Sequence, residues 1–259
     1  VPRELSDQEI ESIVRDFGEA TRRAIEAGYD GVEIHGANGY LIQQFFSPHS
    51  NRRDDRWGGS LEKRLTFPLA VVDEVKRVAA EHANGSFIVG YRFSPEEPET
   101  PGITMADTLV LIDELAKKDL EYLHVSLHDF WSTPKRGVDD TRSRMEIIRE
   151  RVGDQVPVIG VGSIYTPDDA LKAFQALSQI SDELRSIRLA EARFLRGYYH
   201  FELTKIFGNV PYIDETMDDV RVGNGHPIST KIGKDFLYAS SFLPITQKEQ
   251  PGRITKGAS

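Results

Sequence analysis

Residues Asp30–Arg64 read DGVEIHGANGYLIQQFFSPHSNRRDDRWGGSLEKR. This stretch gives the strongest indication of the fold of the first part of the chain. Its opening segment, Gly31–His35, has the apolar character of a short buried strand. A helix is predicted to start after the turn Gly58-Gly59-Ser60 and to extend to about His82. This strand, turn and helix form the unit from which the rest of the fold can be argued.

Strands and helices alternate on both sides of this stretch. Ser6 and Glu9 have the spacing of a capping box, which predicts a helix that ends before Gly28. Further strands are predicted at Phe87–Arg92, Leu120–Leu127 and Pro157–Val161. Further helices are predicted at Thr104–Lys117, Arg142–Arg151 and from Thr166 onward. Apolar strands that alternate with helices indicate an α/β fold with a parallel sheet covered on both faces.

The predicted strands share one feature at their carboxyl ends, where a polar or small residue follows: His35, Arg92, His128 and Gly162. Barrel enzymes build their sites from the carboxyl ends of their strands. This favours a partial (β/α)8 TIM barrel of about four β/α units over a doubly wound sheet. We expect this segment to form a domain over residues 1–175.

After Ala176 the pattern changes to helices without strands. One long helix is predicted from Ser181 to about Ile206, ended by Gly208, and a short one from Gly233 to Phe242. Residues 176–259 hold 11 basic and 10 acidic side chains, whereas residues 1–175 hold 21 and 31. We therefore expect a second, all-α, helical-repeat-like domain over residues 176–259. The helix that begins at Thr166 should cross this joint or break around Gln175–Ser181.

Composition excludes several classes of function. The net charge of −9 argues against a nucleic-acid partner, because phosphates would be repelled. The chain has no cysteine, so disulfides, thiolate zinc sites and iron–sulfur clusters are excluded, and no His or carboxylate spacing predicts a metal site. No apolar run approaches the ~20 residues of a membrane span. With no signal-peptide pattern at the N-terminus, we expect a cytoplasmic protein.

Three polar side chains fall within six residues at the mouth of the first strand: His35, Asn38 and Tyr40. An imidazole and a carboxamide can both donate hydrogen bonds to one ligand oxygen and so polarise a carbonyl group. A phenol beside them can deliver a proton to a carbon that gains negative charge. The competing interpretation is that His35 is structural. On the third strand we expect His124 to be packed, and the orientation of His128 is open.

The segment Asp30–Arg64, continued by VGYRFSP (Val89–Pro95) and VIGVGSIYTPDDA (Val158–Ala170), resembles the old yellow enzyme family of FMN-dependent ene reductases. The resemblance implies FMN as cofactor, NADH or NADPH as reductant and a small-molecule enone as substrate. It implies that His35 and Asn38 hold the carbonyl oxygen and that Tyr40 protonates the alpha carbon. It also assigns cofactor binding to Arg92, near the pyrimidine edge of the flavin, and to a phosphate loop with Gly160, Gly162 and Ser163.

The back segment resembles a different family. RLAEARFLRGYYHFELTKIFGNVPYIDE (Arg188–Glu215) and LPITQKEQPGRITKGAS (Leu243–Ser259) are similar to the SusD/RagB family of outer-membrane glycan-binding lipoproteins. This resemblance implies a glycan as a second ligand. Ala192, Leu195 and Tyr199 lie at helical spacing, and we expect them to form a packing stripe.

The old yellow enzyme barrel has strands without a counterpart here, its first three and its eighth. An open barrel would lose flavin contacts, and its exposed strand edges would favour self-association. Three interpretations therefore remain open: an NAD(P)H-dependent enone reductase, active or inactivated by the missing strands; a glycan-binding scaffold; and a chimeric fragment without function.

Overall fold

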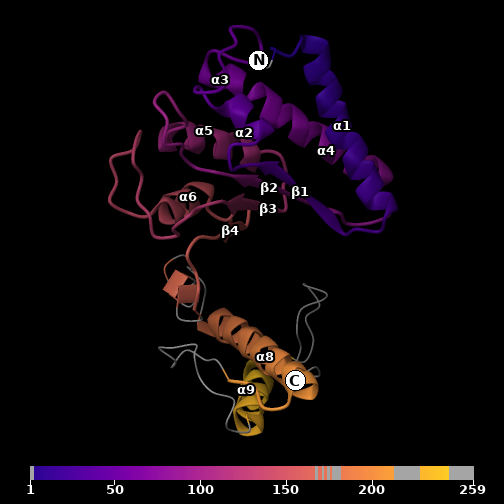
Figure 1. Ribbon diagram of the computed structural model, residues 1–259, viewed down its shortest axis with the longest axis vertical. Coiled ribbons are helices and arrows are strands. Elements are labelled where there is room, and N and C mark those ends of the chain that lie inside the picture. The colour runs from indigo at the N-terminus through magenta and orange to yellow at the C-terminus, as the bar shows by residue number, and fades with distance from the viewer. Residues whose placement is uncertain are drawn as a thin grey trace. The chain divides into compact units, whose positions relative to one another are not determined.

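The computed structural model describes residues 3–166, 169–170, 172–173, 176, 182–212 and 228–244. The chain divides into two compact units, Val1–Tyr165 and Thr166–Ser259 (Figure 1). The predicted joint at Gln175–Ser181 lies outside the described residues apart from Ala176, as does residue 245 onward in the second glycan-family stretch. The domain boundary at residue 175 stays a prediction.

The first unit contains a four-stranded sheet with the strand order β1-β2-β3-β4. The strands are β1 (Gly31–Gly36), β2 (Ile88–Phe93), β3 (Tyr122–Val125) and β4 (Val158–Gly160). All three pairings are parallel, and the register sets His35 opposite Arg92 and Arg92 opposite His124. The predicted α/β fold with a parallel sheet is confirmed, and all four carboxyl ends lie along the same edge.

Six helices accompany the sheet in the described part of this unit: α1 (Asp7–Glu26), α2 (Leu41–Phe46), α3 (Leu61–Arg64), α4 (Thr66–His82), α5 (Met105–Ala116) and α6 (Arg144–Val152). The capping box of Ser6 and Glu9 forms at α1 as predicted. The single helix expected after Ser60 is in fact two, α3 and α4, separated at Leu65. Pro68 has no N–H to donate to the carbonyl of Arg64, which weakens the helical ladder at this point.

One face of the sheet forms the core with the helices. Helices α1 and α4 lie side by side over it in Figure 1, and α2 contacts both β1 and α4. The side chains that point to this face are buried: Ile34, Val89, Tyr91, Phe93, Leu123 and Val125. They alternate along each strand, as the two-residue period of a strand requires.

The opposite face carries the other half of that alternation and is mostly polar. Its side chains are Glu33, His35, Ile88, Arg92, Tyr122, His124 and Ile159. Ile88 and Ile159 are 45% and 42% exposed. This face, here called the open face, would point to the interior of a complete barrel.

The second unit is helical in its described part, as predicted. Helix α8 (Asp182–Phe207) contacts α9 (Ser229–Phe242), and Gly208 with a φ of 71° follows the end of α8. Thr166 and Asp169 form a reciprocal cap, in which the Thr166 N–H donates to the Asp169 carboxylate (3.0 Å); Pro167 and Asp168 lie outside the described residues. No helix in the described ranges is long and apolar enough to cross a membrane.

The packing stripe of α8 differs from the expected one. Ala190 and Phe194 pack with residues of α9, whereas Leu195 and Tyr199 are exposed, and the side chain of Ala192 lies outside the described ones. The prediction that Leu195 and Tyr199 are core residues is therefore wrong for the described part of this unit. A helix turns about 100° per residue, so α9 covers the side of α8 one residue away from the predicted stripe.

Candidate functional site

The structure brings His35, Asn38 and Tyr40 together at the carboxyl end of β1. His35 belongs to β1 on the open face, and the backbone then turns through Asn38 and Gly39, which have φ values of 58° and 75°. Tyr40 is the N-cap of α2, and its ring centroid lies 5.3 Å from that of His35. All three side chains are exposed, which leaves their polar atoms accessible to a ligand.

Asn38 is held by side chains from two neighbouring strands. Its backbone N–H donates to Oγ of Ser94, just after β2, at 2.9 Å. Its Oδ1 accepts from Oγ of Ser126, just after β3, also at 2.9 Å. Because few non-glycine residues adopt a positive φ, these contacts explain how Asn38 keeps one.

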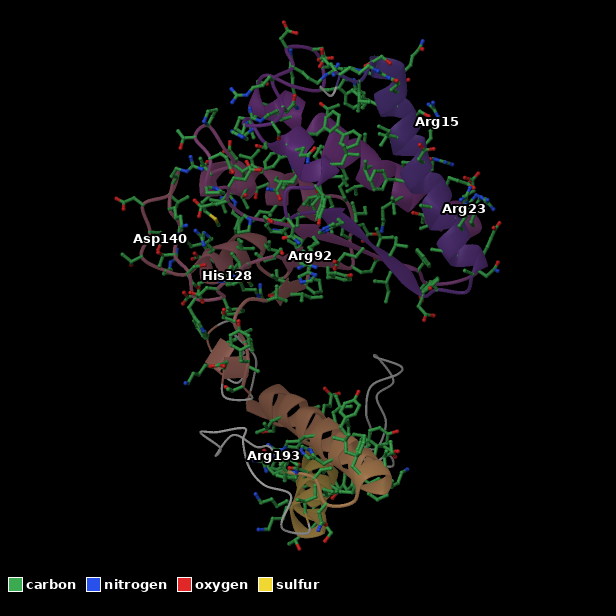
Figure 2. The ribbon with its side chains drawn as sticks, in the orientation of Figure 1. Arg15, Arg23, Arg92, His128, Asp140 and Arg193 are labelled. Atoms are coloured by element: carbon green, nitrogen blue, oxygen red, sulfur yellow. The ribbon has the colours of Figure 1, made fainter. Side chains whose placement is uncertain are left out.

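Arg92 lies on the strands at the open face (Figure 2). Its Nη2 donates to Oγ of Ser126 at 3.0 Å, while its Nε is buried and has no hydrogen-bond partner within the described part of the chain. A buried donor without a partner costs about 1–3 kcal/mol. An acceptor atom of a bound ligand would remove this cost, so the arrangement fits a ligand edge that carries carbonyl or anionic oxygen and nitrogen acceptors.

The open face contains a second polar cluster, which was not predicted from the sequence. Nδ1 of His124 lies 2.8 Å from a Glu33 carboxylate oxygen, and Nε2 of His124 is buried without a partner among the described residues. Burial, together with a hydrogen bond to Glu33, raises the pKa of Tyr122 to about 12. His124 is thus largely buried, as expected, but as a partner of Glu33 rather than as part of an apolar core. The sequence feature that could have indicated this cluster is the position of Glu33 two residues before His35, which places both side chains on the same face of β1.

Two of the three predicted phosphate-binding residues, Gly162 and Ser163, lie in the loop after β4, and Gly160 is the last residue of β4 itself. Gly162 has a φ of 128°, and a Cβ there would lie 2.7 Å from the Leu127 carbonyl oxygen. Ser163 has a φ of 51°, and its Oγ donates to the carbonyl of His128 at 2.9 Å. A Cβ at Gly160 would lie 2.6 Å from both Cε of Met145 and Cε2 of Phe130, so a larger residue there would displace buried side chains.

The predicted site residues therefore form two groups in the structure. One group contains His35, Asn38, Tyr40 and Arg92; Ser126 joins Asn38 to Arg92, and the ring of Tyr40 lies beside that of His35. The other is the Gly160–Ser163 segment, held by the segment after β3, in which the side chain of His128 is exposed. Over the described ranges, no group of three or more His, Asp or Glu could hold a metal ion.

Comparison with known proteins is in line with this geometry. Residues 1–179 match the family model described as the NADH:flavin oxidoreductase / NADH oxidase family. The probable NADH-dependent flavin oxidoreductase YqiG of Bacillus subtilis (strain 168) is 65% identical over 175 residues, which are 68% of this chain and 47% of that protein. The NADH:acrylate oxidoreductase of Vibrio harveyi is 49% identical over 67% of this chain and 18% of that protein. The chain thus spans about half the length, or less, of these relatives.

Solved structures agree. Morphinone reductase in complex with tetrahydroNAD is similar with a TM-score of 0.54 and 32% identity, over 69% of this chain and 46% of that one. The old yellow enzyme homologue from Zymomonas mobilis is similar with a TM-score of 0.54 and 26% identity, over 68% and 48%. The first unit therefore corresponds to part of a TIM barrel of the old yellow enzyme type.

The back of the chain matches a second family model, described as starch-binding associating with outer membrane, over residues 163–259. This agrees with the predicted similarity to the SusD/RagB family. The match covers the smaller part of the chain and overlaps the first match over residues 163–179.

The first family and its structural neighbours imply FMN as cofactor and NADH or NADPH as reductant. The residues present fit part of such a cofactor: the buried Nε of Arg92, which has no partner among the described residues, is a donor for its acceptor atoms. The left-handed turn at Gly162 and Ser163 brings backbone into a tight loop of the kind that binds anions. Through residues 1–179, the chain belongs to the NADH:flavin oxidoreductase / NADH oxidase family, that of the old yellow enzymes.

Proposed function

We propose that this protein reduces an activated carbon–carbon double bond of an enone, with NADH or NADPH as the reductant and FMN as the cofactor. The observation that carries the proposal is the convergence of two hydrogen-bond donors, His35 and Asn38, and one phenol, Tyr40, at the end of β1. The rings of His35 and Tyr40 lie 5.3 Å apart, and Asn38 is held by two serines. Family membership supports the reaction type.

His35 and Asn38 would bind the substrate by its carbonyl oxygen. Two donors on one oxygen draw electron density from the conjugated system, which makes the beta carbon electron-poor and stabilises the negative charge that develops on the oxygen. When bound, FMN would supply the hydride for that carbon. Tyr40, which follows Asn38 by two residues, would donate its phenolic proton to the alpha carbon and complete the saturated product.

Arg92 would hold the cofactor. Its guanidinium group is always positively charged, so it favours a ligand edge that gains negative charge. Nε of Arg92, which has no partner among the described residues, can donate a hydrogen bond to that edge, while Nη2 stays bonded to Ser126. Backbone N–H groups of the Gly160–Ser163 loop are the proposed phosphate contacts.

Flavin uptake tests the proposal. The purified chain is mixed with FMN and desalted, and a flavin absorbance that stays with the protein is expected. Added NADH should bleach it, and cyclohexenone should restore it. His35→Ala combined with Asn38→Ala should keep the flavin but lose the long-wavelength charge-transfer band with phenolic ligands. A chain that never retains FMN contradicts the proposal.

The substrate class can be refined in the same assay. One relative is named NADH:acrylate oxidoreductase, so an unsaturated carboxylate is the alternative to an enone. A carboxylate would need a cation near His35 and Asn38, and Arg92, the cation bonded to Ser126 beside Asn38, is the residue proposed above to hold the cofactor. We therefore expect cyclohexenone to be reduced faster than acrylate, and the reverse order would assign the carboxylate.

A second candidate function, glycan binding, rests on the exposed aromatic side chains of α8. Tyr198, Tyr199 and Phe201 are 43%, 61% and 46% exposed, and the rings of the two tyrosines lie 5.8 Å apart. We propose that these rings stack on a sugar, in line with the starch-binding family match. Calorimetric titration with starch, xylan and mucin oligosaccharides tests this, with Tyr198→Ala combined with Tyr199→Ala as the matched variant. A flat isotherm for the unmodified chain would exclude it.

We also propose self-association through the edges of the sheet. Within the described residues, β1 and β4 each pair with one strand only, so each has an edge that is open to a further strand. Sedimentation velocity over a range of concentrations should show a dimer or larger species. A monomer at all concentrations would refute this.

A further inference from the structure

Three side chains from three consecutive strand ends form a chain of hydrogen bonds beside the proposed substrate site. Arg92 Nη2 lies 3.0 Å from Oγ of Ser126, and Oγ of Ser126 lies 2.9 Å from Oδ1 of Asn38. Ser126 is half-buried and lies directly after β3, where its backbone N–H donates to the carbonyl of Phe93 at 2.8 Å. The position of its hydroxyl is therefore set by the sheet itself.

The direction of these hydrogen bonds follows from the chemistry of the groups. A guanidinium has donors and no acceptor, so Arg92 must donate and Ser126 must accept. The hydroxyl of Ser126 has a single proton, and this proton remains for Asn38. Asn38 must therefore present its carbonyl oxygen to Ser126. The two N–H bonds of the Asn38 amide then point away from Ser126 and are left for a ligand.

The alternative amide orientation is unfavourable for the same reason. If Asn38 turned its NH2 group to Ser126, that hydroxyl would have two donors facing it and its own proton would need another acceptor. The backbone of Asn38 cannot relax to help, because its N–H is bonded to Oγ of Ser94 and its φ is 58°. The amide is thus fixed in direction as well as in place.

We propose that Ser126 is a positioning residue that, with Arg92 as the terminal donor, orients the carboxamide of Asn38 so that its NH2 group faces the substrate oxygen. This rests on the proposed role of Asn38 as an oxygen-binding donor. It also joins the residue proposed to contact the cofactor, Arg92, to the residue proposed to bind substrate, through one hydroxyl group.

The first test uses the flavin-free chain and nuclear magnetic resonance. The side-chain NH2 signals of Asn38 are assigned by their loss in Asn38→Asp. Ser126→Ala should shift these signals, because the amide oxygen loses its donor, and Ser126→Thr should restore them, because it keeps a hydroxyl. Ser50→Ala is the matched control, since its hydroxyl bonds the carbonyl of Gln44 elsewhere in the same unit. Unshifted Asn38 signals in Ser126→Ala would overturn the proposal.

The second test measures the affinity of the FMN-loaded chain for a phenolic ligand such as p-hydroxybenzaldehyde by absorbance titration. Ser126→Ala should weaken binding by about 3–10-fold, the worth of one hydrogen bond, while Ser126→Thr and Ser50→Ala bind as the unmodified chain does. Equal affinity in Ser126→Ala would overturn the role in ligand binding. If the unmodified chain takes up no FMN, the proposed function fails, and the first test still decides whether Ser126 orients Asn38.

Discussion

The two faces of the four-stranded sheet have the same backbone and opposite chemistry. The face toward the helices is made of buried apolar side chains such as Tyr91 and Leu123. The open face carries Glu33, Arg92 and His124, together with two buried nitrogen atoms that lack partners among the described residues. Adjacent residues of one strand point to opposite faces, so side chains that pack in the core alternate along the strand with side chains of the open face.

The two faces have opposite effects on the free energy of unfolding. Full burial of a large apolar side chain stabilises a fold by about 1.5–3 kcal/mol. An unsatisfied buried polar group costs about 1–3 kcal/mol. The helix-covered face therefore holds the sheet together, and the open face lowers the stability that the first face supplies. A ligand that binds to the open face would raise the stability of the protein, because polar atoms of the ligand can form hydrogen bonds with the unpaired nitrogen atoms of that face.

The largest expected effect belongs to the open face. Tyr40→Phe removes the proposed proton donor while keeping the ring beside His35, so enone-dependent reoxidation of the bound flavin should slow about 10²–10⁴-fold. Reduction by NADH should be nearly unchanged, because it requires no proton from Tyr40. Stopped-flow absorbance separates the two half-reactions. An equal loss in both would assign Tyr40 a structural role.

The next effect belongs to the helix-covered face. Leu123 is fully buried, so Leu123→Ala should lower the free energy of unfolding by about 2–5 kcal/mol. Ile159→Ala on the open face is the matched control and should cost less than half as much, because Ile159 is 42% exposed. Urea denaturation followed by circular dichroism gives both values. Equal costs would mean that the two faces are equally packed in solution.

A smaller effect is expected for cofactor affinity. Arg92→Met removes the charged donor at the proposed flavin edge and should weaken FMN binding about 10–100-fold, as for the loss of a hydrogen bond to a charged group. Arg23→Met is the control, because Arg23 lies on α1, away from the strands (Figure 2). Flavin fluorescence quenching measures both dissociation constants. Similar values for Arg92→Met and the unmodified chain would remove Arg92 from the cofactor site.

The smallest effect concerns pH. Burial and the bond to Glu33 raise the pKa of Tyr122 to about 12, so the folded chain holds the phenolic proton more tightly than the unfolded chain, in which tyrosine has a pKa of about 10. The resulting stabilisation is complete below about pH 10 and is lost as the pH rises toward 12. Urea midpoints should fall over this range, and less steeply in Tyr122→Phe. Tyr29→Phe, which removes an exposed phenol, should follow the unmodified chain.

Much of the fold could be predicted because its signals are local. A capping box such as Ser6 and Glu9 lies within one helical turn, and the apolar strands need no knowledge of their neighbours to be recognised. The break between α3 and α4 was missed although Pro68 marks it: Pro68 is tolerated in the first turn of α4, but it would lie inside a single helix that started at Leu61 and would interrupt its hydrogen bonds. The packing side of α8 was missed because it depends on where α9 lies.

The order of strands and helices was predictable from the sequence apart from the break between α3 and α4, and so was the cluster of His35, Asn38 and Tyr40, because these three residues lie within six positions at one strand end. Contacts across strands, such as Glu33 with His124 and Ser126 with Asn38, could not be predicted, because their partners lie 91 and 88 residues apart and meet only when the sheet forms. These contacts depend on the register of the strands. A shift of one residue between two strands would turn each of these side chains to the other face, and that register is set by the packing of the whole sheet against its helices.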